Sequence, residues 1–184
     1  MKRCPWSKLE TSKTYQTYHD EEWGVPSYED SYLFEMLVLE SFHCGLSWLI
    51  ILNKREAFRE AFDFFDAEKI KDYQLDKIEQ LLNNKEIVRN KLKIMATIEN
   101  AKAFLKVKEE FGSFKGYIWG FTNHEVVYRQ DDLLHTRNEL SDRVSKDLKK
   151  RGFRFMGSVT TYSYLEAIGV MNNHVKSCFK YHTF

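Results

Sequence analysis

Two cysteines and two histidines stand near the two ends of this chain, and their types are those of a zinc site. Cys4 and His19 precede residue 20. His174 and Cys178 are four residues apart near the other end, so on a helical turn the side chains of these two residues would face the same way. Two Cys and two His form a common tetrahedral zinc set. The halves lie about 155 residues apart without a finger pattern. Spacing alone therefore leaves two interpretations open: a zinc site that pins the ends together, or an incidental terminal thiol and a surface histidine.

A second group of residues could bind a flat ring. Glu40 ends an apolar stretch, and a buried carboxylate needs a partner or a purpose because burial of an unpaired charge is costly. Aromatic walls hold a flat, electron-poor or cationic ring, and a carboxylate accepts its N–H groups. A nucleobase flipped out of DNA is such a ligand. In a chain with 15% aromatic residues, however, any single one is more often part of the core. The candidate wall residues are Trp6, Tyr15, Tyr18, Trp23 and Trp48.

The segment 81–94 could contact a phosphate. It reads as a helix, a tight polar break and a second helix that opens with the basic residues Arg89, Lys91 and Lys93. Backbone N–H groups at such a turn can hold a phosphate, and the basic side chains add positive charge. The alternative is an ordinary helix–helix connection with a solvated basic face.

Composition limits the class of protein. The chain has 184 residues, 43% of them hydrophobic, which is enough for one domain with a core and excludes a disordered chain. The net charge of +1 excludes nucleic-acid binding by overall charge, so any such contact must be local. Three cysteines cannot form a complete disulfide framework. No apolar run approaches the roughly 20 residues that span a bilayer, and the first residues lack the apolar core of a secretion signal. We expect a soluble, cytoplasmic protein.

The elements that must position these residues are predicted to be helices nearly throughout. The only two prolines are Pro5 and Pro26, so nothing after them forbids long helices. Apolar periodicity and capping residues predict helices over 30–40, 47–62, 75–82, 87–111, 141–151 and 159–169. The best strand candidate is 125–129. We expect one all-α domain over residues 1–184.

Taken together, these motifs resemble the bacterial 3-methyladenine DNA glycosylase I family, which belongs to the helix–hairpin–helix glycosylase superfamily. The resemblance covers essentially the whole chain in order. It includes Arg3-Cys4-Pro5-Trp6, the stretch from Tyr18 to Pro26, Leu33-Phe34-Glu35-Met36, Gly45-Leu46-Ser47-Trp48, the stretch from Lys149 to Gly157, and Asn173-His174-Val175.

The resemblance implies a fold and a metal. The fold is a helix–hairpin–helix glycosylase-like bundle whose termini are joined at a structural zinc. The ligands match Cys4, His19, His174 and Cys178, so an N-terminal arm, 1–27, and a C-terminal segment, 170–184, form the part stapled by the metal.

The resemblance also implies a base pocket. Glu40 matches the family's glutamate, which reads the methylated adenine, and is the expected catalytic-site acid. The walls match Trp6, Tyr15, Tyr18, Trp23 and Trp48, with Tyr18 and Trp48 closest to the base.

The implied reaction is base excision from double-stranded DNA by a monomeric, monofunctional glycosylase without lyase activity. Methylation at N3 makes adenine cationic, so the glycosidic bond is already weakened. The superfamily's usual Asp after the hairpin is absent, because residues 86–130 contain no Asp. Only a good leaving group can dispense with it, which predicts a narrow range centred on 3-methyladenine. Leu46 is the candidate wedge that fills the gap in the base stack.

Two stretches depart from the family pattern. Phe42-His43-Cys44 stands where Gln-Gln-Ala is common, so the probing of lesions or the pocket shape is expected to differ. Cys44 is expected to be a buried thiol. Glu86 replaces the usual hairpin glycine, so either Asn84 adopts the positive φ angle or the turn is reshaped.

Three alternatives stay open. The chain could bind damaged DNA without cutting it, it could excise a different alkylated base, or it could be a zinc-stapled helical protein with an unrelated partner. Base release and affinity for free 3-methyladenine distinguish them.

Overall fold

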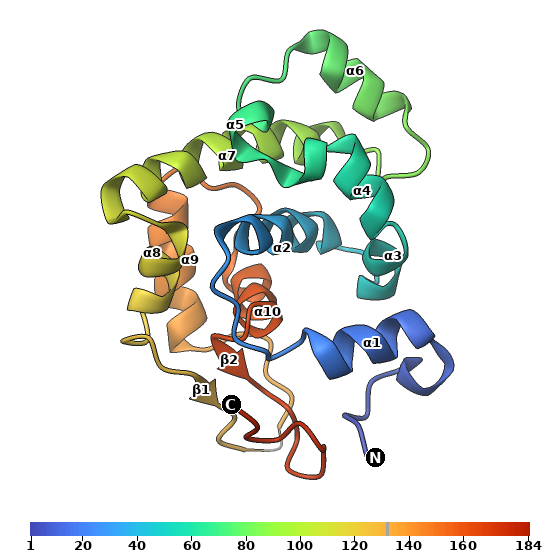
Figure 1. The fold of residues 1–184 in the computed structure, drawn as a ribbon, viewed down its shortest axis with the longest axis vertical. Helices are drawn as coiled ribbons and strands as arrows, with labels where there is room; N and C mark the ends of the chain where they lie inside the picture. Colours follow the sequence, from blue (N-terminus) through green and yellow to red (C-terminus); the bar gives the residue numbers. More distant parts are fainter. Residues whose placement is uncertain (132) are drawn as a thin grey trace.

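The computed structural model of the protein describes residues 1–131 and 133–184 and is mainly α-helical (Figure 1). Ten α-helices occur in these residues: α1 (Lys13–Glu21), α2 (Asp30–His43), α3 (Trp48–Asn53), α4 (Arg55–Ala61), α5 (Ala67–Ile70), α6 (Leu75–Asn83), α7 (Lys91–Phe111), α8 (Phe114–Gly120), α9 (Glu139–Lys150) and α10 (Ser158–Ala167). Two 3₁₀ turns, η1 (Leu9–Thr11) and η2 (Asp63–Phe65), and two strands, β1 (Val127–Tyr128) and β2 (Met171–Asn172), complete the order. The expectation of a helical chain is confirmed; that it is a single domain stays a prediction.

Helix α2 lies in the middle of the fold and is buried along most of its length. Its sequence is apolar nearly all round, as a helix enclosed by other helices requires. It packs against α3, α7, α8 and α10. The Asp30 side chain also accepts hydrogen bonds from the backbone N–H groups of Phe114 and Lys115 at the start of α8. Glu40, in the last turn of α2, is thereby held at a fixed place in the interior.

Several helix boundaries differ from the expected ones for local reasons. The helix expected over 47–62 is divided at Lys54 into α3 and α4. The long helix begins at Lys91 rather than at residue 87, because the Asn90 side chain caps it by accepting the N–H of Lys93. Helix α9 begins at Glu139 because Asn138 and Ser141 form a capping box.

The connection between α6 and α7 resolves the question raised by Glu86. Neither Asn84 nor Glu86 is among the described residues with positive φ angles. Instead, the Asn84 side-chain oxygen accepts the N–H of Glu86 at 2.9 Å. The turn is therefore reshaped around an Asn-based turn that needs no glycine.

The strand candidate at 125–129 is confirmed over Val127–Tyr128, but its partner was not predicted. Strand β1 pairs in parallel with β2, and Val127 N–H donates to the Val170 carbonyl at 2.9 Å. This pairing holds the loop after β1 beside the C-terminal segment (Figure 1).

The end of α10 is packed tightly against the N-terminal arm. Gly169 adopts a φ angle of +74°, and a Cβ atom there would lie 2.2 Å from the Val25 carbonyl carbon. Gly24 N–H donates to the Glu166 carbonyl, and Ser27 N–H to the Ile168 carbonyl. At the chain ends, Phe179 N–H donates to the Lys2 carbonyl at 2.9 Å. None of the described helices has the length and apolar character that crossing a membrane requires.

Candidate active site and metal centre

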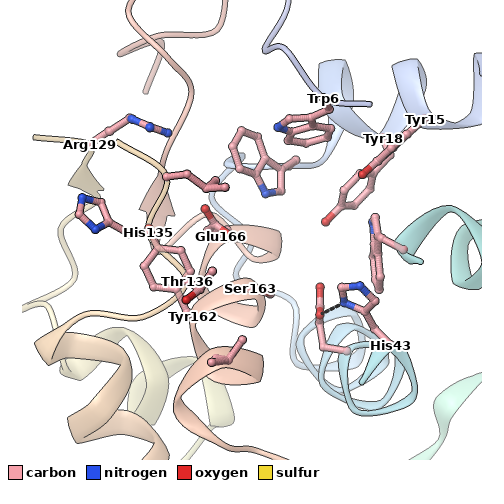
Figure 2. Close-up of a pocket in the computed structure, with 15 residues that line it drawn as sticks. Trp6, Tyr15, Tyr18, His43, Arg129, His135, Thr136, Tyr162, Ser163 and Glu166 are labelled. Carbon is pink, nitrogen blue, oxygen red and sulfur yellow. Dashed lines mark hydrogen bonds and ion pairs between the residues drawn. The ribbon is translucent and has the colours of Figure 1, made fainter. Parts of the chain in front are cut away.

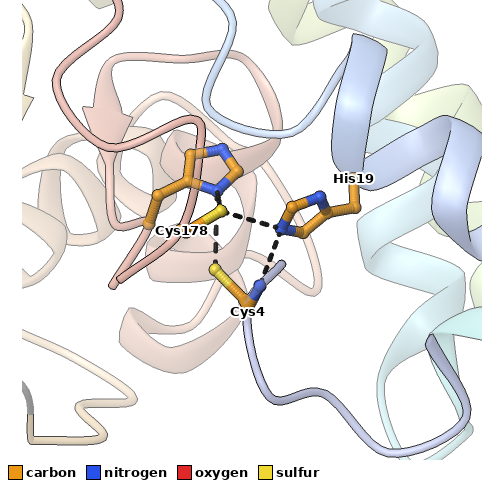
Figure 3. Close-up of side chains that lie close together, drawn as sticks. Cys4, His19 and Cys178 are labelled. Carbon is orange, nitrogen blue, oxygen red and sulfur yellow. Dashed lines mark hydrogen bonds between the residues drawn. The ribbon is translucent and has the colours of Figure 1, made fainter. Parts of the chain in front are cut away.

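The four predicted metal ligands lie together in the interior (Figure 3). The ligand atoms of Cys4, His19, His174 and Cys178 are all within 4.8 Å of one another, and all four residues are buried. His174 Nδ1 lies 3.5 Å from the Cys4 sulfur and 3.4 Å from the Cys178 sulfur, which lies 3.6 Å from His19 Nε2. Zinc bonds of about 2.3 Å to sulfur and about 2.0–2.1 Å to nitrogen would place tetrahedral S and N ligands roughly 3.5 Å apart. The cluster could therefore hold a metal ion.

The second ring nitrogen of each histidine is already engaged. His19 Nδ1 lies 2.8 Å from the Asp20 carboxylate, and His174 Nε2 lies 3.0 Å from the Trp23 carbonyl. Arg3 binds the other side of Asp20 through Nε and Nη2. These partners assign the proton of each ring to the outward nitrogen, so the inward nitrogen carries a lone pair that faces the cluster. The inward Nε2 of His19 also accepts the backbone N–H of Cys4 at 3.3 Å.

The electrostatics of the cluster also suit a metal. Burial raises the pKa of the Cys4 thiol to about 12, so a thiolate there needs a cation beside it. Burial lowers the pKa of His174 to about 4, which keeps the imidazole in the neutral form that binds metals.

A cavity of about 260 Å³ lies between α1, the end of α2, the start of α3, α10 and the loop after β1 (Figure 2). The structure brings all six predicted base-pocket residues to its lining: Trp6, Tyr15, Tyr18, Trp23, Glu40 and Trp48. They come from three separate stretches of sequence, so the fold and not sequence proximity assembles them.

The aromatic rings of the cavity are tightly arranged. Trp6 packs edge-on against Trp23 with ring centroids 4.5 Å apart and lies 5.2 Å from Tyr15. The rings of Tyr18 and Trp48 have centroids 5.4 Å apart and planes tilted by 56°. The Trp48 indole N–H is buried without a hydrogen-bond partner in the described residues, so an acceptor on a ligand would satisfy it.

Glu40 is one of two glutamates that line this cavity, and its side chain is only about 4% exposed. Burial raises the pKa of its carboxyl group, whereas the hydrogen bond from His43 Nδ1 at 3.0 Å opposes that rise. His43 itself packs edge-on against Trp48 at 5.2 Å. The carboxylate is therefore oriented by a histidine that stands in one of the two departures from the family pattern.

Sequence reasoning missed the far side of the cavity. This side is formed by Arg129, Leu134, His135, Thr136, Val159, Tyr162, Ser163 and Glu166. Glu166 lies in the apolar helix α10 just as Glu40 lies in the apolar helix α2. The same signal, an acid within an apolar helix, could have found it.

The four predicted DNA-contacting residues separate into two groups. Leu46, Arg89 and Lys91 are exposed, and Leu46 follows Gly45, which takes a φ angle of +80° in the turn after α2. Lys93 is buried instead, and its ammonium group donates to the carbonyl oxygens of Phe42 and Cys44 at 2.8 and 2.7 Å. The structure thus gives Lys93 an inward role, because its charge is used to hold the turn before Leu46.

Cys44 is half-buried rather than fully buried as expected. Its sulfur lies 3.1 Å from the Thr160 hydroxyl. It makes no part of the metal cluster.

The fold and the cavity define a helical protein with an aromatic-lined cavity that holds buried acids, and with a separate Cys/His cluster that could hold a metal ion. Comparison with known proteins narrows this class. The methyladenine glycosylase family matches residues 6–181. The chain is 40% identical to DNA-3-methyladenine glycosylase 1 of Escherichia coli K12 over 181 residues, which covers 97% of this chain and 96% of that protein. It is 39% identical to DNA-3-methyladenine glycosylase of Haemophilus influenzae, with 96% of each chain covered.

Solved structures agree. A crystal structure of 3-methyladenine DNA glycosylase I superposes with a TM-score of 0.93 at 39% identity and covers 98% of this chain and 100% of that one. A variant of 3-methyladenine DNA glycosylase I in complex with 3-methyladenine superposes with a TM-score of 0.89 at 38% identity, covering 92% and 93%. The chain belongs to the methyladenine glycosylase family and is a glycosylase hydrolase.

Proposed function

We propose that the protein is a base-excision repair glycosylase that takes a flipped 3-methyladenine into the cavity and hydrolyses its N-glycosidic bond. The observation that carries this proposal is the buried Glu40 carboxylate among aromatic walls, in a cavity sized for a small flat ligand. A relative solved in complex with 3-methyladenine supports the choice of base.

The residues divide the work of recognition. Tyr18 and Trp48 are assigned to stack on the base, because both rings are buried and line the cavity together with Glu40. Trp6, Tyr15 and Trp23 close the remaining wall. Glu40 accepts N–H groups of the base and favours its positive charge, so we assign it the catalytic-site role of reading the base rather than of activating water.

The chemistry places few demands on the protein. An adenine methylated at N3 leaves as a neutral base, so the sugar cation needs little further stabilisation, in keeping with the absence of Asp from residues 86–130. No lysine is among the described residues that line the cavity, and a lyase would need an amine nucleophile. We therefore propose a monofunctional enzyme with a range centred on 3-methyladenine.

Contacts with double-stranded DNA are assigned to one edge of the cavity. Leu46 is the apolar wedge that fills the gap left by the flipped nucleotide. The N–H groups of the reshaped helix–hairpin–helix turn bind phosphate with the exposed Arg89 and Lys91. Lys93 stabilises the turn that carries Leu46 by donating hydrogen bonds to the carbonyl oxygens of Phe42 and Cys44.

The metal is proposed to be a structural zinc ion held by Cys4, His19, His174 and Cys178. Two sulfur and two imidazole ligands with S···N distances near those of tetrahedral zinc support this choice. The protein is proposed to act as a cytoplasmic monomer.

Base release tests the proposal directly. The protein is incubated with DNA treated with a methylating agent, and freed bases and strand breaks are analysed. Free 3-methyladenine without 7-methylguanine and without nicked strands is expected. No released base from folded, metal-loaded protein would contradict the enzyme and favour a module that binds damaged DNA without cutting it.

A further inference from the structure

Glu166 is a second acid of the base cavity, to which no role has yet been given. It is the penultimate residue of α10 and lies across the cavity from His43 (Figure 2). Its side chain is partly accessible from the cavity and is otherwise enclosed.

The surroundings of Glu166 leave its charge unpaired. One carboxylate oxygen accepts the Asn173 side-chain N–H at 2.8 Å, and no ion pair involves Glu166 in the described residues. Arg129 also lines the cavity, and its guanidinium donates to the carbonyl oxygens of Asp131, Leu133 and Asn173. Arg129 thus holds the loop after β1 rather than neutralising the acid.

The position is electrostatically unfavourable for a carboxylate. Burial raises the pKa of Glu166 to about 8, and Glu40 in the same cavity adds to that rise. The C-terminal end of a helix also disfavours a negative charge. A neutral side chain would therefore be more stable in the empty protein.

A purely structural role accounts for the hydrogen bond and not for the charge. The Asn173 side chain bridges Glu166 and the Tyr162 hydroxyl, which joins α10 to the segment after β2. A glutamine amide oxygen could accept the same N–H group. The backbone carbonyl that binds Gly24 does not depend on the side chain.

We propose that Glu166 is a specificity-determining residue that, together with Glu40, reads the positive charge of the alkylated base. This inference rests on the proposed function and names the electrostatic property by which the cavity distinguishes damaged from normal bases. A base methylated at N3 and still attached to its sugar carries a delocalised positive charge, which offsets two acids in one cavity. A neutral base leaves the second acid protonated and gains no attraction from it, so the cavity prefers the cation.

The test compares a permanent cation with a neutral ligand. The cation 3,9-dimethyladeninium mimics the charged nucleoside without a cleavable bond, and free 3-methyladenine at pH 8 is its neutral counterpart. Glu166→Gln is expected to lower the affinity for the cation about tenfold, which corresponds to the charge interaction that shifts a pKa by about one unit. It should change the affinity for the neutral base less than about twofold, because the Asn173 hydrogen bond is retained.

Three variants serve as controls. Glu40→Gln should lower the affinity for both ligands. Glu60→Gln removes one charge from the exposed face of α4 and should change the affinity for neither. Tyr162→Phe removes one partner of Asn173 but keeps the Glu166 charge, so it should preserve the preference for the cation. Equal changes for both ligands in Glu166→Gln, or the same loss of preference in Tyr162→Phe, would overturn the inference.

A measurement on the unaltered protein is independent of any variant. Raising the pH from 7 to 9 ionises Glu166, so affinity for the cation should rise while that for the neutral base stays flat. The other titratable or charged groups that line the cavity are Tyr15, Tyr18, Glu40, His43, Arg129, His135 and Tyr162. A flat profile for the cation would refute the role of Glu166, whereas failure to bind either ligand would refute the proposed function itself.

Discussion

At the scale of single residues, the cavity contains a histidine, His43, that hydrogen-bonds its buried acid Glu40. His43 donates to Glu40 and contacts the face of Trp48 through its ring edge. Burial raises the pKa of Glu40, and protonation would turn one of its two acceptor oxygens into a hydroxyl donor. The hydrogen bond from His43 opposes that rise and orients the carboxyl group.

Replacement of His43 by Phe should shift the pH dependence of base binding. The ring would be kept, but without the Nδ1–H donor the pKa of Glu40 rises further. As pH falls, the carboxylate then becomes protonated earlier, so affinity for 3-methyladenine should be lost at a higher pH than in the unaltered protein. Fluorescence titrations between pH 5 and 8 measure this, and superimposable profiles would contradict the assigned role.

Some residues of the site could be predicted from the sequence, and others could not. Glu40 was predictable because an acid in an apolar helix stands out, and the four Cys and His ligands were suggested by their chemistry. Lys93 was misjudged because its type is the same whether it points to solvent or to two carbonyl groups. The direction of a side chain depends on how α7 packs against the end of α2, which is a long-range property.

At the scale of elements, the link between α7 and the turn after α2 should matter for DNA more than for the free base. Lys93→Met leaves two buried carbonyl groups without their donor, so the free energy of unfolding should fall by about 1–3 kcal/mol. Because the turn carries Leu46, base excision from DNA should fall more than affinity for free 3-methyladenine.

The matched control for Lys93 is the exposed Lys91. Lys91→Met should leave the free energy of unfolding unchanged and weaken DNA binding. The slope of log affinity against log salt concentration should decrease in magnitude by about one, because one phosphate contact is lost. If Lys93→Met showed that salt effect instead, the inward role of Lys93 would be wrong.

The contact between α10 and the N-terminal arm predicts an uneven response to alanine. Gly169→Ala would force a Cβ against the Val25 carbonyl at 2.2 Å and should destabilise the protein by about 2 kcal/mol or more. Gly112 has a similar φ angle of +77° but open space around it, so Gly112→Ala reports the backbone strain alone. Thermal unfolding of both variants measures the difference, and equal losses would argue against a close packed contact.

The helices could be predicted because local apolar periodicity determines them. The pairing of the strands could not be predicted because it depends on contacts between residues far apart in the sequence. Apolar periodicity located α2, α6, α7, α9 and α10 to within a few residues. The partner of β1 is β2, more than forty residues later, and only the folded chain brings them together. The part of the cavity lining that follows β1, which includes Arg129, was missed for the same reason.

At the scale of the whole molecule, the metal cluster joins the two ends of the chain. Removal of the proposed zinc ion with a chelator should lower the melting temperature and speed amide hydrogen exchange in residues 1–27 and 170–184 together, because both segments contribute residues to the Cys/His cluster. Asp20→Asn should weaken metal binding by about tenfold to a hundredfold through His19. Exchange that rises in only one of the two segments would contradict the staple.

The carbonyl of Trp23 binds His174, while its ring lines the base cavity. One wall of that cavity is thus fixed by residues that the ribosome adds some 150 positions later. During synthesis, the emerging chain can complete α2 and its acid long before it can close the pocket around a base. The wall formed by Trp23 can therefore be fixed only after residue 174 has been synthesised and folded back onto the N-terminal arm.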